Sequence, residues 1–171
     1  MHVHQLAAGE EVLDIRIDEP GAGEWVMAQL GAHFTPVWDH SFTTHEEGKI
    51  LGGFVLSHYI GGSITCHMAS QDPRWCSRDL MWLIFDYAFH QLGCHKMLVA
   101  LASDEHKIIE MDMRAGWQLE AVVRDAYAPG KHMLILGMTE AKCPWLKHKP
   151  RAWVPRTKEP PDGQAQPAAS A

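Results

Sequence analysis

Hydrophobic and polar positions form their clearest patterns from Lys49 onward. Residues 49–60 and 63–70 are rich in β-branched and aromatic side chains, and the pair Gly61-Gly62 between them is a tight-turn signal. We therefore expect a β-hairpin over 49–70. The chain before Thr44 is less regular: residues 21–31 suggest a short helix, and residues 33–42 carry the Pro, Asp and His of an exposed loop.

A long apolar helix is predicted after this hairpin, within the stretch SQDPRWCSRDLMWLIFDYAFHQLG (70–93). Between Leu80 and Leu92 almost every position is apolar, so this helix must pack against a sheet and be covered on its other side as well. Gly93 predicts its end. The polar turn before it has two interpretations: either it holds an anionic group such as a phosphate, or Trp75 plugs the end of a core.

The second half of the chain continues the alternation of strands and helices. Residues 95–103 form a nearly continuous apolar run, as in a central strand buried on both faces. Residues 104–116 have helical periodicity, with a predicted inward stripe of Ile108, Met111 and Ala115, widened by Ile109 and Met113. Two strands follow, around 117–127 and 131–139, with a turn at APGK between them.

This order of elements predicts the fold class. A strand–helix–strand unit joins parallel strands, whereas the flanking hairpins supply antiparallel ones. We expect an α/β (α+β) fold with a single mixed, mostly antiparallel sheet and helices on both faces. One domain should span residues 1–156, and residues 157–171, rich in Pro, Gln and Ala, should form a flexible tail.

Composition narrows the functional classes. The chain has 171 residues, 46% of them hydrophobic, which is typical of a globular domain, and a formal net charge of −6 that disfavours a general nucleic-acid binder. Four scattered cysteines and no leader-like start predict a reducing cytoplasm. We expect no membrane span, and no metal site, because the twelve histidines show no ligand spacing.

Several motifs in residues 49–146 resemble the GNAT superfamily of acyl-CoA-dependent N-acyltransferases. The segment GGFVLSHYIGGSITCHMA stands where that family has two antiparallel strands before its cofactor loop, and RWCSRDLMWLIFDYAFHQLGCHKM resembles the loop and the helix that follow. The segment AGWQLEAVVRD resembles the entry to the family's next strand. The terminal CPWL is similar to phage-encoded members. The resemblance implies a GNAT-like fold and acetyl-CoA, or another acyl-CoA, as cofactor.

The resemblance also implies cofactor-binding residues. Backbone N–H groups near Met68 and Ala69 would hold the acyl carbonyl. The pyrophosphate would lie against the loop and helix start, made of Arg74, Trp75, Cys76, Ser77, Arg78 and Asp79. This loop departs from the family pattern R/Q-x-x-G-x-G/A, because Ser77 and Asp79 replace both glycines. The tyrosine that often protonates the departing thiolate falls at Asp112, so a general acid would have to be water or lie elsewhere.

Catalytic and acceptor residues can be suggested from chemistry. His67 adjoins Met68 on one strand, and an imidazole titrates near neutrality, so His67 is the first candidate for the base. Glu105, at the start of the next helix, is the second. Asp39 and His40, in the preceding loop, would shape the acceptor pocket. Cys76 near a helix start could react covalently, but no partner pattern of a cysteine hydrolase accompanies it.

The sequence therefore predicts an N-acyltransferase that moves acetyl from acetyl-CoA to an amine of a small molecule, protein or nucleobase. An alternative is a binding or regulatory protein that keeps the fold without catalysis, as the missing glycines and tyrosine would suggest. A nucleobase-modifying relative is a third reading, supported only by the similarity to phage-encoded members. Such a member would act in the host cytoplasm.

Overall fold

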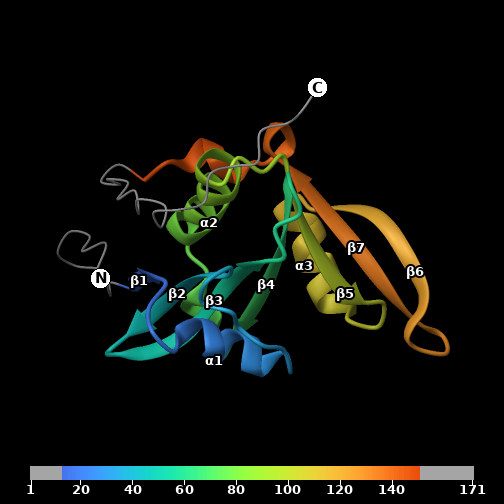
Figure 1. Cartoon of the computed structure of the whole chain (residues 1–171), viewed down its shortest axis with the longest axis horizontal. Coiled ribbons are helices and arrows are strands. Elements are labelled where there is room, and N and C mark those ends of the chain that lie inside the picture. The colour runs from blue at the N-terminus through green and yellow to red at the C-terminus, as the bar shows by residue number, and fades with distance from the viewer. Residues whose placement is uncertain (1–12, 151–171) are drawn as a thin grey trace.

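The computed structural model describes residues 13–150 (Figure 1), and its centre is one seven-stranded sheet. The predicted tail at 157–171 lies outside the described residues. The strands are β1 (Asp14–Ile17), β2 (His40–Glu46), β3 (Lys49–Ser57), β4 (Ser63–Ser70), β5 (Lys96–Ala102), β6 (Gln118–Ala128) and β7 (Lys131–Thr139). The helices are α1 (Ala22–Gln29), α2 (Arg78–Asp86) and α3 (His106–Ala115).

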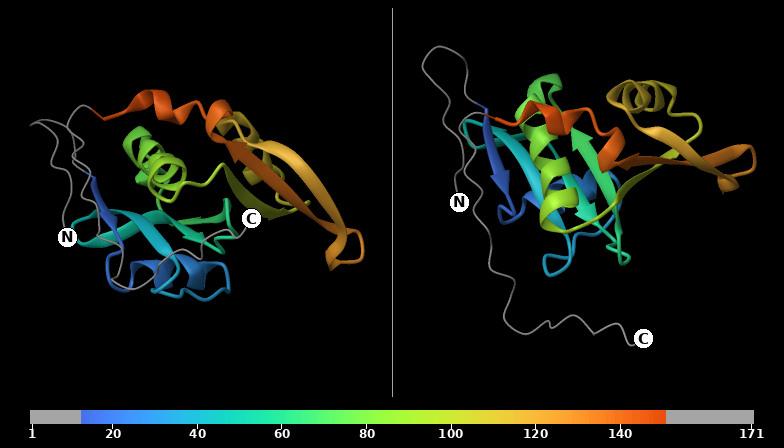
Figure 2. Two further views of the ribbon diagram at one scale, coloured as in Figure 1. Left: turned by 45° about the horizontal axis from the view of Figure 1, so that its top comes forward. Right: turned by 90° about the horizontal axis from the view of Figure 1, so that it is seen from above.

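The order of strands across the sheet is β1-β2-β3-β4-β5-β7-β6. Only β4 and β5 run parallel, and they are the strands joined through α2; every other neighbouring pair is antiparallel. Helix α1 covers one face of the sheet and α2 the other (Figure 2). The predicted mixed sheet with helices on both faces is thus confirmed.

Helix α2 is buried on almost its whole circumference, as its composition predicts. Every residue from Leu80 to Phe85 is buried. One side packs on the sheet, and the chain after β7 crosses the other side (Figure 2), where a short turn, Trp145–His148, lies against it. The ammonium of Lys149 stands 6.0 Å from the centre of the Trp82 ring. The expected cover is therefore supplied by the last described segment.

The end of this helix differs from the prediction in one respect. Residues Tyr87–Gln91 form a π-helical turn instead of continuing the α-helix, so that the N–H of Leu92 reaches the carbonyl of Tyr87 at 2.9 Å. Gly93, with φ of 69°, then ends the helix in the left-handed region that glycine tolerates. The predicted position of the helix end is confirmed.

The loop predicted over residues 33–42 is wrong at its end, because His40 already begins β2. This strand was hidden by its polar composition, HSFTTHE, although most of its residues are buried. Some of its buried polar groups have partners inside the protein: Thr44 donates to the carbonyl of Trp75 at 2.7 Å, and Thr43 shares a hydrogen bond of 2.9 Å with His45. Among the described residues, the Ser41 hydroxyl and Nδ1 of His45 have none. Buried polar side chains that find partners can occupy a strand interior.

The predicted inward face of α3 is partly wrong. Met111 and Met113 are half exposed, and the only fully buried residue of the helix is Asp112. Ile108 and Asp112 are one helical turn apart, so both lie on the inward face of the helix, which Met111 does not share. A carboxyl group therefore occupies a position that a helix would normally give to an apolar side chain.

Strand β6 extends from the body of the protein together with β7 (Figure 1). All of its residues are exposed, and it is an outer strand of the sheet. Within residues 13–150, no helix has both the length and the apolar character that a membrane crossing requires.

Trp75 closes the end of the core beneath α2. It is 9% exposed, its ring lies 4.8 Å from that of Phe54, and it fills the space above Gly52, where an added Cβ would come within 2.7 Å of the indole. The indole is thus a packing element of the loop that precedes α2.

We expect Trp75→Ala to lower the free energy of unfolding by about 3–5 kcal/mol, because the vacated volume cannot be refilled by neighbouring side chains. Urea unfolding followed by circular dichroism measures the change. Trp38→Ala is the matched control, since Trp38 is 62% exposed, and its effect should stay within about 0.5 kcal/mol. Equal losses in the two variants would contradict this role for Trp75.

Candidate functional site

The sheet opens where β4 and β5 separate. Their pairing is limited to Ser63↔Lys96, Ile64↔Met97 and Thr65↔Leu98, after which the two strands diverge toward their carboxyl ends (Figure 1). Beyond Thr65 the backbone of β4 is paired only with β3 on its other side. Alternate N–H and C=O groups of β4 therefore face the gap without a strand to bind them.

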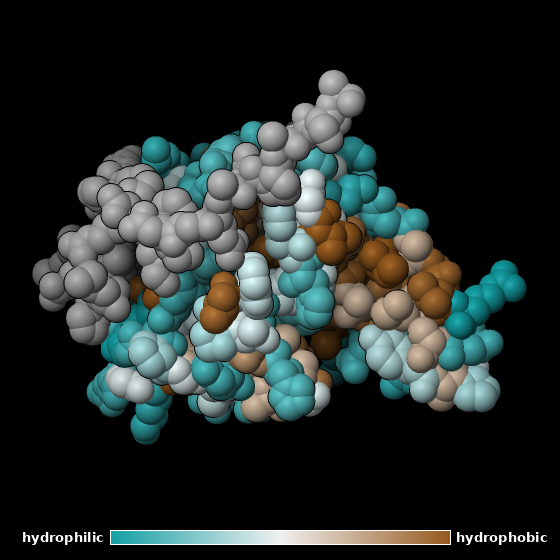
Figure 3. Space-filling model, viewed as in Figure 1, coloured by the Kyte–Doolittle hydropathy of each residue, from teal (hydrophilic) through white to brown (hydrophobic). Residues whose placement is uncertain are grey.

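A cleft of about 340 Å³ occupies this fork. Its size is that of a small-molecule site. Its walls come from the end of α1, from β4, β5 and α3, and from the β6–β7 hairpin; they comprise Leu30, Cys66, His67, Met68, Val99, Ala100, Leu101, Ala102, Glu105, Ile108, Tyr127 and Lys131. Apolar residues also gather on the β5–β7–β6 side of the surface (Figure 3), so the cleft opens beside an apolar region.

His67 lines this cleft from the α1 side of β4. Successive strand residues point to opposite faces; Cys66 joins the core around α2, whereas Ala69 packs against the cluster around α1, so His67 shares the α1 face. Its Nε2 atom lies 2.8 Å from the hydroxyl of Ser57. Burial, and secondarily the charge of His58, lower the pKa of His67, which keeps the imidazole neutral at pH 7.

The other predicted residues of the cleft lie around His67. Met68 follows it on β4, and Glu105, exposed at the start of α3, belongs to the opposite wall. Ala69 lies beyond the cleft on β4, in register with Gly53 of β3. The fold therefore brings His67, Met68 and Glu105, which are distant in sequence, around one cavity.

The two predicted acceptor residues are separated by the sheet. Asp39 is 7% exposed, accepts the N–H of Thr35 at 2.8 Å, and is close enough to His67 for its charge to raise the pKa of that imidazole. His40 turns to the other face, where its Nδ1 lies 3.2 Å from both Asp18 and the Tyr87 hydroxyl. Only Asp39 is on the side of the cleft that His67 faces.

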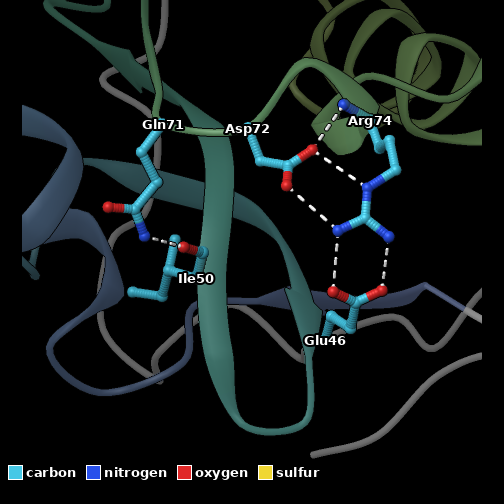
Figure 4. A network of polar contacts seen from close by, with 5 residues as sticks. All are labelled: Glu46, Ile50, Gln71, Asp72 and Arg74. Atoms are coloured by element: carbon cyan, nitrogen blue, oxygen red, sulfur yellow. Dashed lines mark hydrogen bonds and ion pairs between the residues drawn. The ribbon is translucent and has the colours of Figure 1, made fainter.

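Arg74 is already held by two carboxylates. Its guanidinium makes a two-pronged contact with Glu46, at 2.7 and 2.8 Å, and contacts Asp72 at 3.0 and 3.1 Å (Figure 4). The Asp72 carboxylate also accepts the N–H of Arg74, while Gln71 donates to the carbonyl of Ile50 beside it. These contacts raise the pKa of Arg74 and lower that of Asp72. They tie the loop to the β2–β3 end of the sheet.

The remaining loop residues form the start of α2. The hydroxyl of Ser77 accepts the N–H of Leu80 at 3.1 Å and so caps the helix. The first turn of any helix has N–H groups without an intrahelical acceptor, and here it carries Arg78, which is exposed, and Asp79. Cys76 is exposed, but neighbouring groups desolvate its thiol and raise the pKa to about 11, so that it is protonated at neutral pH.

Three residues near the cleft escaped the sequence analysis as functional candidates. Ser57 and His58, at the end of β3, connect to His67 through hydrogen bonds. Asp112 is buried, and among the described residues its Oδ2 has no hydrogen-bond partner. Burial raises the pKa of Asp112 to about 6, and its charge acts on Cys66, which lines the cleft. The sequence drew attention to Asp112 only as the residue at the position of the family's tyrosine, and gave no sign that its carboxyl is buried.

Comparisons with known proteins identify the fold. No family model matches the chain, and no curated protein matches it. Among solved structures, spermidine/spermine N-acetyltransferase SpeG of Vibrio cholerae in complex with manganese ions superposes with a TM-score of 0.60 at 14% identity, covering 76% of this chain and 94% of that one. Mutant forms of the same enzyme give a TM-score of 0.62 at 14% identity, covering 80% and 99%.

A further mutant of the Vibrio cholerae spermidine N-acetyltransferase reaches 18% identity with a TM-score of 0.52, covering 64% of this chain and 68% of that one. These acetyltransferases are GNAT superfamily members. At such low identity the likeness shows the fold alone, and it confirms the GNAT-like architecture predicted from the sequence.

The buried carboxyl of Asp112 should make stability depend on pH. Its pKa is higher in the folded protein than in the unfolded chain, so the folded state binds the extra proton, and stability falls as pH rises from about 4 to 6. A shift of this size corresponds to at most about 3 kcal/mol. Asp112→Asn should lose this fall, which urea unfolding at several pH values will measure.

Glu110→Gln is the control for this measurement, because Glu110 is exposed on the same helix. It should retain the wild-type slope of unfolding free energy against pH. A slope in Asp112→Asn equal to that of the wild type would show that Asp112 is not the titrating group.

Proposed function

We propose that the chain is an acyl-CoA-dependent N-acyltransferase that transfers acetyl from acetyl-CoA to an amine. The observation that supports this most is the fork between β4 and β5, whose cleft holds a neutral imidazole, His67, beside unpaired strand backbone. Ligands of sheets with parallel strands bind beyond the carboxyl ends of those strands, which is where the cleft opens. The start of α2 follows the same end of β4.

The phosphates of the cofactor would bind at the first turn of α2. Free N–H groups and the helix dipole attract anions there, and Arg78 adds a positive charge that can form charge-assisted hydrogen bonds. Backbone N–H groups would come from Cys76, Ser77 and Asp79. Arg74 would hold the loop in place through its contacts with Glu46 and Asp72. Trp75 would support this loop from the core side.

The acyl end would extend into the fork. An amide N–H of β4 near Met68 or Ala69 would hold the carbonyl oxygen and stabilise the negative charge that develops on it during attack. His67 would take the proton from the attacking amine, and the acyl group would pass to nitrogen as the cofactor thiolate leaves. Glu105 on the facing wall would attract and orient a cationic amine, and Asp39 would border its path.

The acceptor we propose to test first is a polyamine. The fold neighbours are acetyltransferases of spermidine and spermine, and the net charge of −6 favours the approach of cations. Cytoplasmic location and similarity to phage-encoded members stay predictions. The alternative, a binding or regulatory protein without catalysis, is favoured by one observation: the guanidinium of Arg74 already binds two carboxylates.

Binding of acetyl-CoA tests the cofactor site. At about a hundred times its dissociation constant, acetyl-CoA should raise the unfolding free energy by about 2.7 kcal/mol, measured by thermal or urea unfolding. Arg78→Ala should weaken binding about tenfold, whereas Arg124→Ala, exposed on β6, should not. Stabilisation without release of free thiol for any amine would favour the alternative of a non-catalytic protein. No stabilisation would contradict the proposed acetyl-CoA-dependent transferase.

His67→Gln tests the base. The variant should bind acetyl-CoA like the wild type but lower kcat/KM for the amine by about 10²–10⁴-fold. Because burial lowers the pKa of His67, the pH profile of wild-type kcat/KM should contain an acidic ionisation from this imidazole that is absent in His67→Gln. His90→Gln, on the surface near α2, is the control. Activity in His67→Gln close to wild type would remove His67 from the mechanism.

A further inference from the structure

A chain of hydrogen-bonded side chains leads from the cleft to the surface. The Nε2 atom of His67 lies 2.8 Å from the Ser57 hydroxyl, and this hydroxyl lies 2.6 Å from Nδ1 of His58. Ser57 is 1% exposed, whereas His58 is exposed. The three residues thus join a half-buried imidazole in the cleft to a second imidazole in contact with solvent.

The strand register produces this arrangement. Val55 is opposite His67 and Ser57 is opposite Thr65, so Ser57 and His67 are diagonal neighbours on one face of the sheet. Strand β3 ends at Ser57, and His58 has a positive φ of 52°, a conformation that costs energy for any residue other than glycine. The two imidazole rings are consequently 6.1 Å apart, with the hydroxyl between them.

The need of the buried Ser57 hydroxyl for a hydrogen-bond partner does not explain why both imidazoles contact it. A buried Ser needs one partner, and His67 already supplies it. His58 adds a second partner from a strained backbone position at the surface. A hydroxyl between two imidazoles can accept a proton from one ring while donating its own to the other.

We propose that Ser57 and His58 form a proton relay for His67. This proposal rests on the transferase activity proposed above. As the new C–N bond forms, Nδ1 of His67 takes a proton from the amine. The proton on Nε2 passes to Ser57, the Ser57 proton passes to Nδ1 of His58, and His58 releases a proton from Nε2 to water. One proton leaves the cleft, and His67 returns to its neutral form as the other tautomer, with its proton on Nδ1. After product release, loss of the Nδ1 proton to solvent and return of a proton through His58 and Ser57 to Nε2 restore the starting tautomers.

The relay would remove the proton that a partly buried His67 takes from the amine. Burial disfavours a charged His67, so a proton taken from the amine has to leave the imidazole again. The exit through Ser57 leads from the cleft to the exposed His58. The charged and titratable groups around His67 are Asp39 on the α1 side, which favours the imidazolium, His58, which opposes it, and Glu105, Tyr127 and Lys131 in the facing walls.

His58→Gln is the first test, because His58 is exposed and its loss should leave the fold intact. We expect kcat of amine acetylation to fall about tenfold, with little change in KM. Imidazole buffer at millimolar concentration should restore kcat, since a small base can replace the missing ring. Ser57→Ala should show the same fall but no restoration. His90→Gln, another exposed histidine in hydrogen-bonded contacts, should behave as wild type in both buffers.

Nitrogen-15 NMR of the histidine rings provides a readout that needs no turnover. In the wild type, titration of His58 should perturb both ring nitrogens of His67, and Ser57→Ala should abolish this coupling. If the wild type acetylates amines and His58→Gln retains kcat within twofold without added imidazole, the relay is overturned and the transferase stands. If the wild type acetylates no amine, the proposed function itself is overturned, whatever the NMR coupling shows.

Discussion

The end of hydrogen bonding between β4 and β5, one residue after Ile64 meets Met97, is the constraint on which the site depends. Up to Thr65 the two strands form ordinary parallel sheet; beyond it, backbone groups that a neighbouring strand would satisfy face an open cleft. An unpaired strand edge inside a protein is costly unless something binds there. The fork therefore combines space for an extended ligand with backbone partners that can bind it.

Much of the architecture could be predicted because local signals agreed with the tertiary structure. The apolar run of α2 and the turn at Gly61-Gly62 each had one sensible interpretation, and both are confirmed. Strand β2 was missed because its buried Thr and His side chains look like those of a loop, and the distant partner of Thr44, the carbonyl of Trp75, is invisible in the sequence. Asp112 was misjudged for the same reason, since periodicity alone cannot show that a carboxyl takes the inward position.

The sequence predicted the site only through individual residues whose side chains can do acid–base chemistry. His67 and Glu105 attracted attention by residue type and resemblance, and the fold places both around one cavity. The sequence could not show which side chains bind one another across the fold. Glu46, 28 residues before Arg74, binds its guanidinium. Contacts of this kind depend on where loops meet in space. In the structure Arg74 is bound by two carboxylates, and its role as a phosphate ligand stays a prediction.

The cover over α2 has a consequence for biosynthesis. Residues Trp145–His148, together with Cys143 in the main core, are the last described parts of the chain to leave the ribosome. Until they emerge, one flank of an almost wholly apolar helix lacks the segment that covers it among the described residues. The nascent domain must therefore expose an apolar surface until this segment emerges. In that state, chaperone binding or premature association competes with completion of the fold.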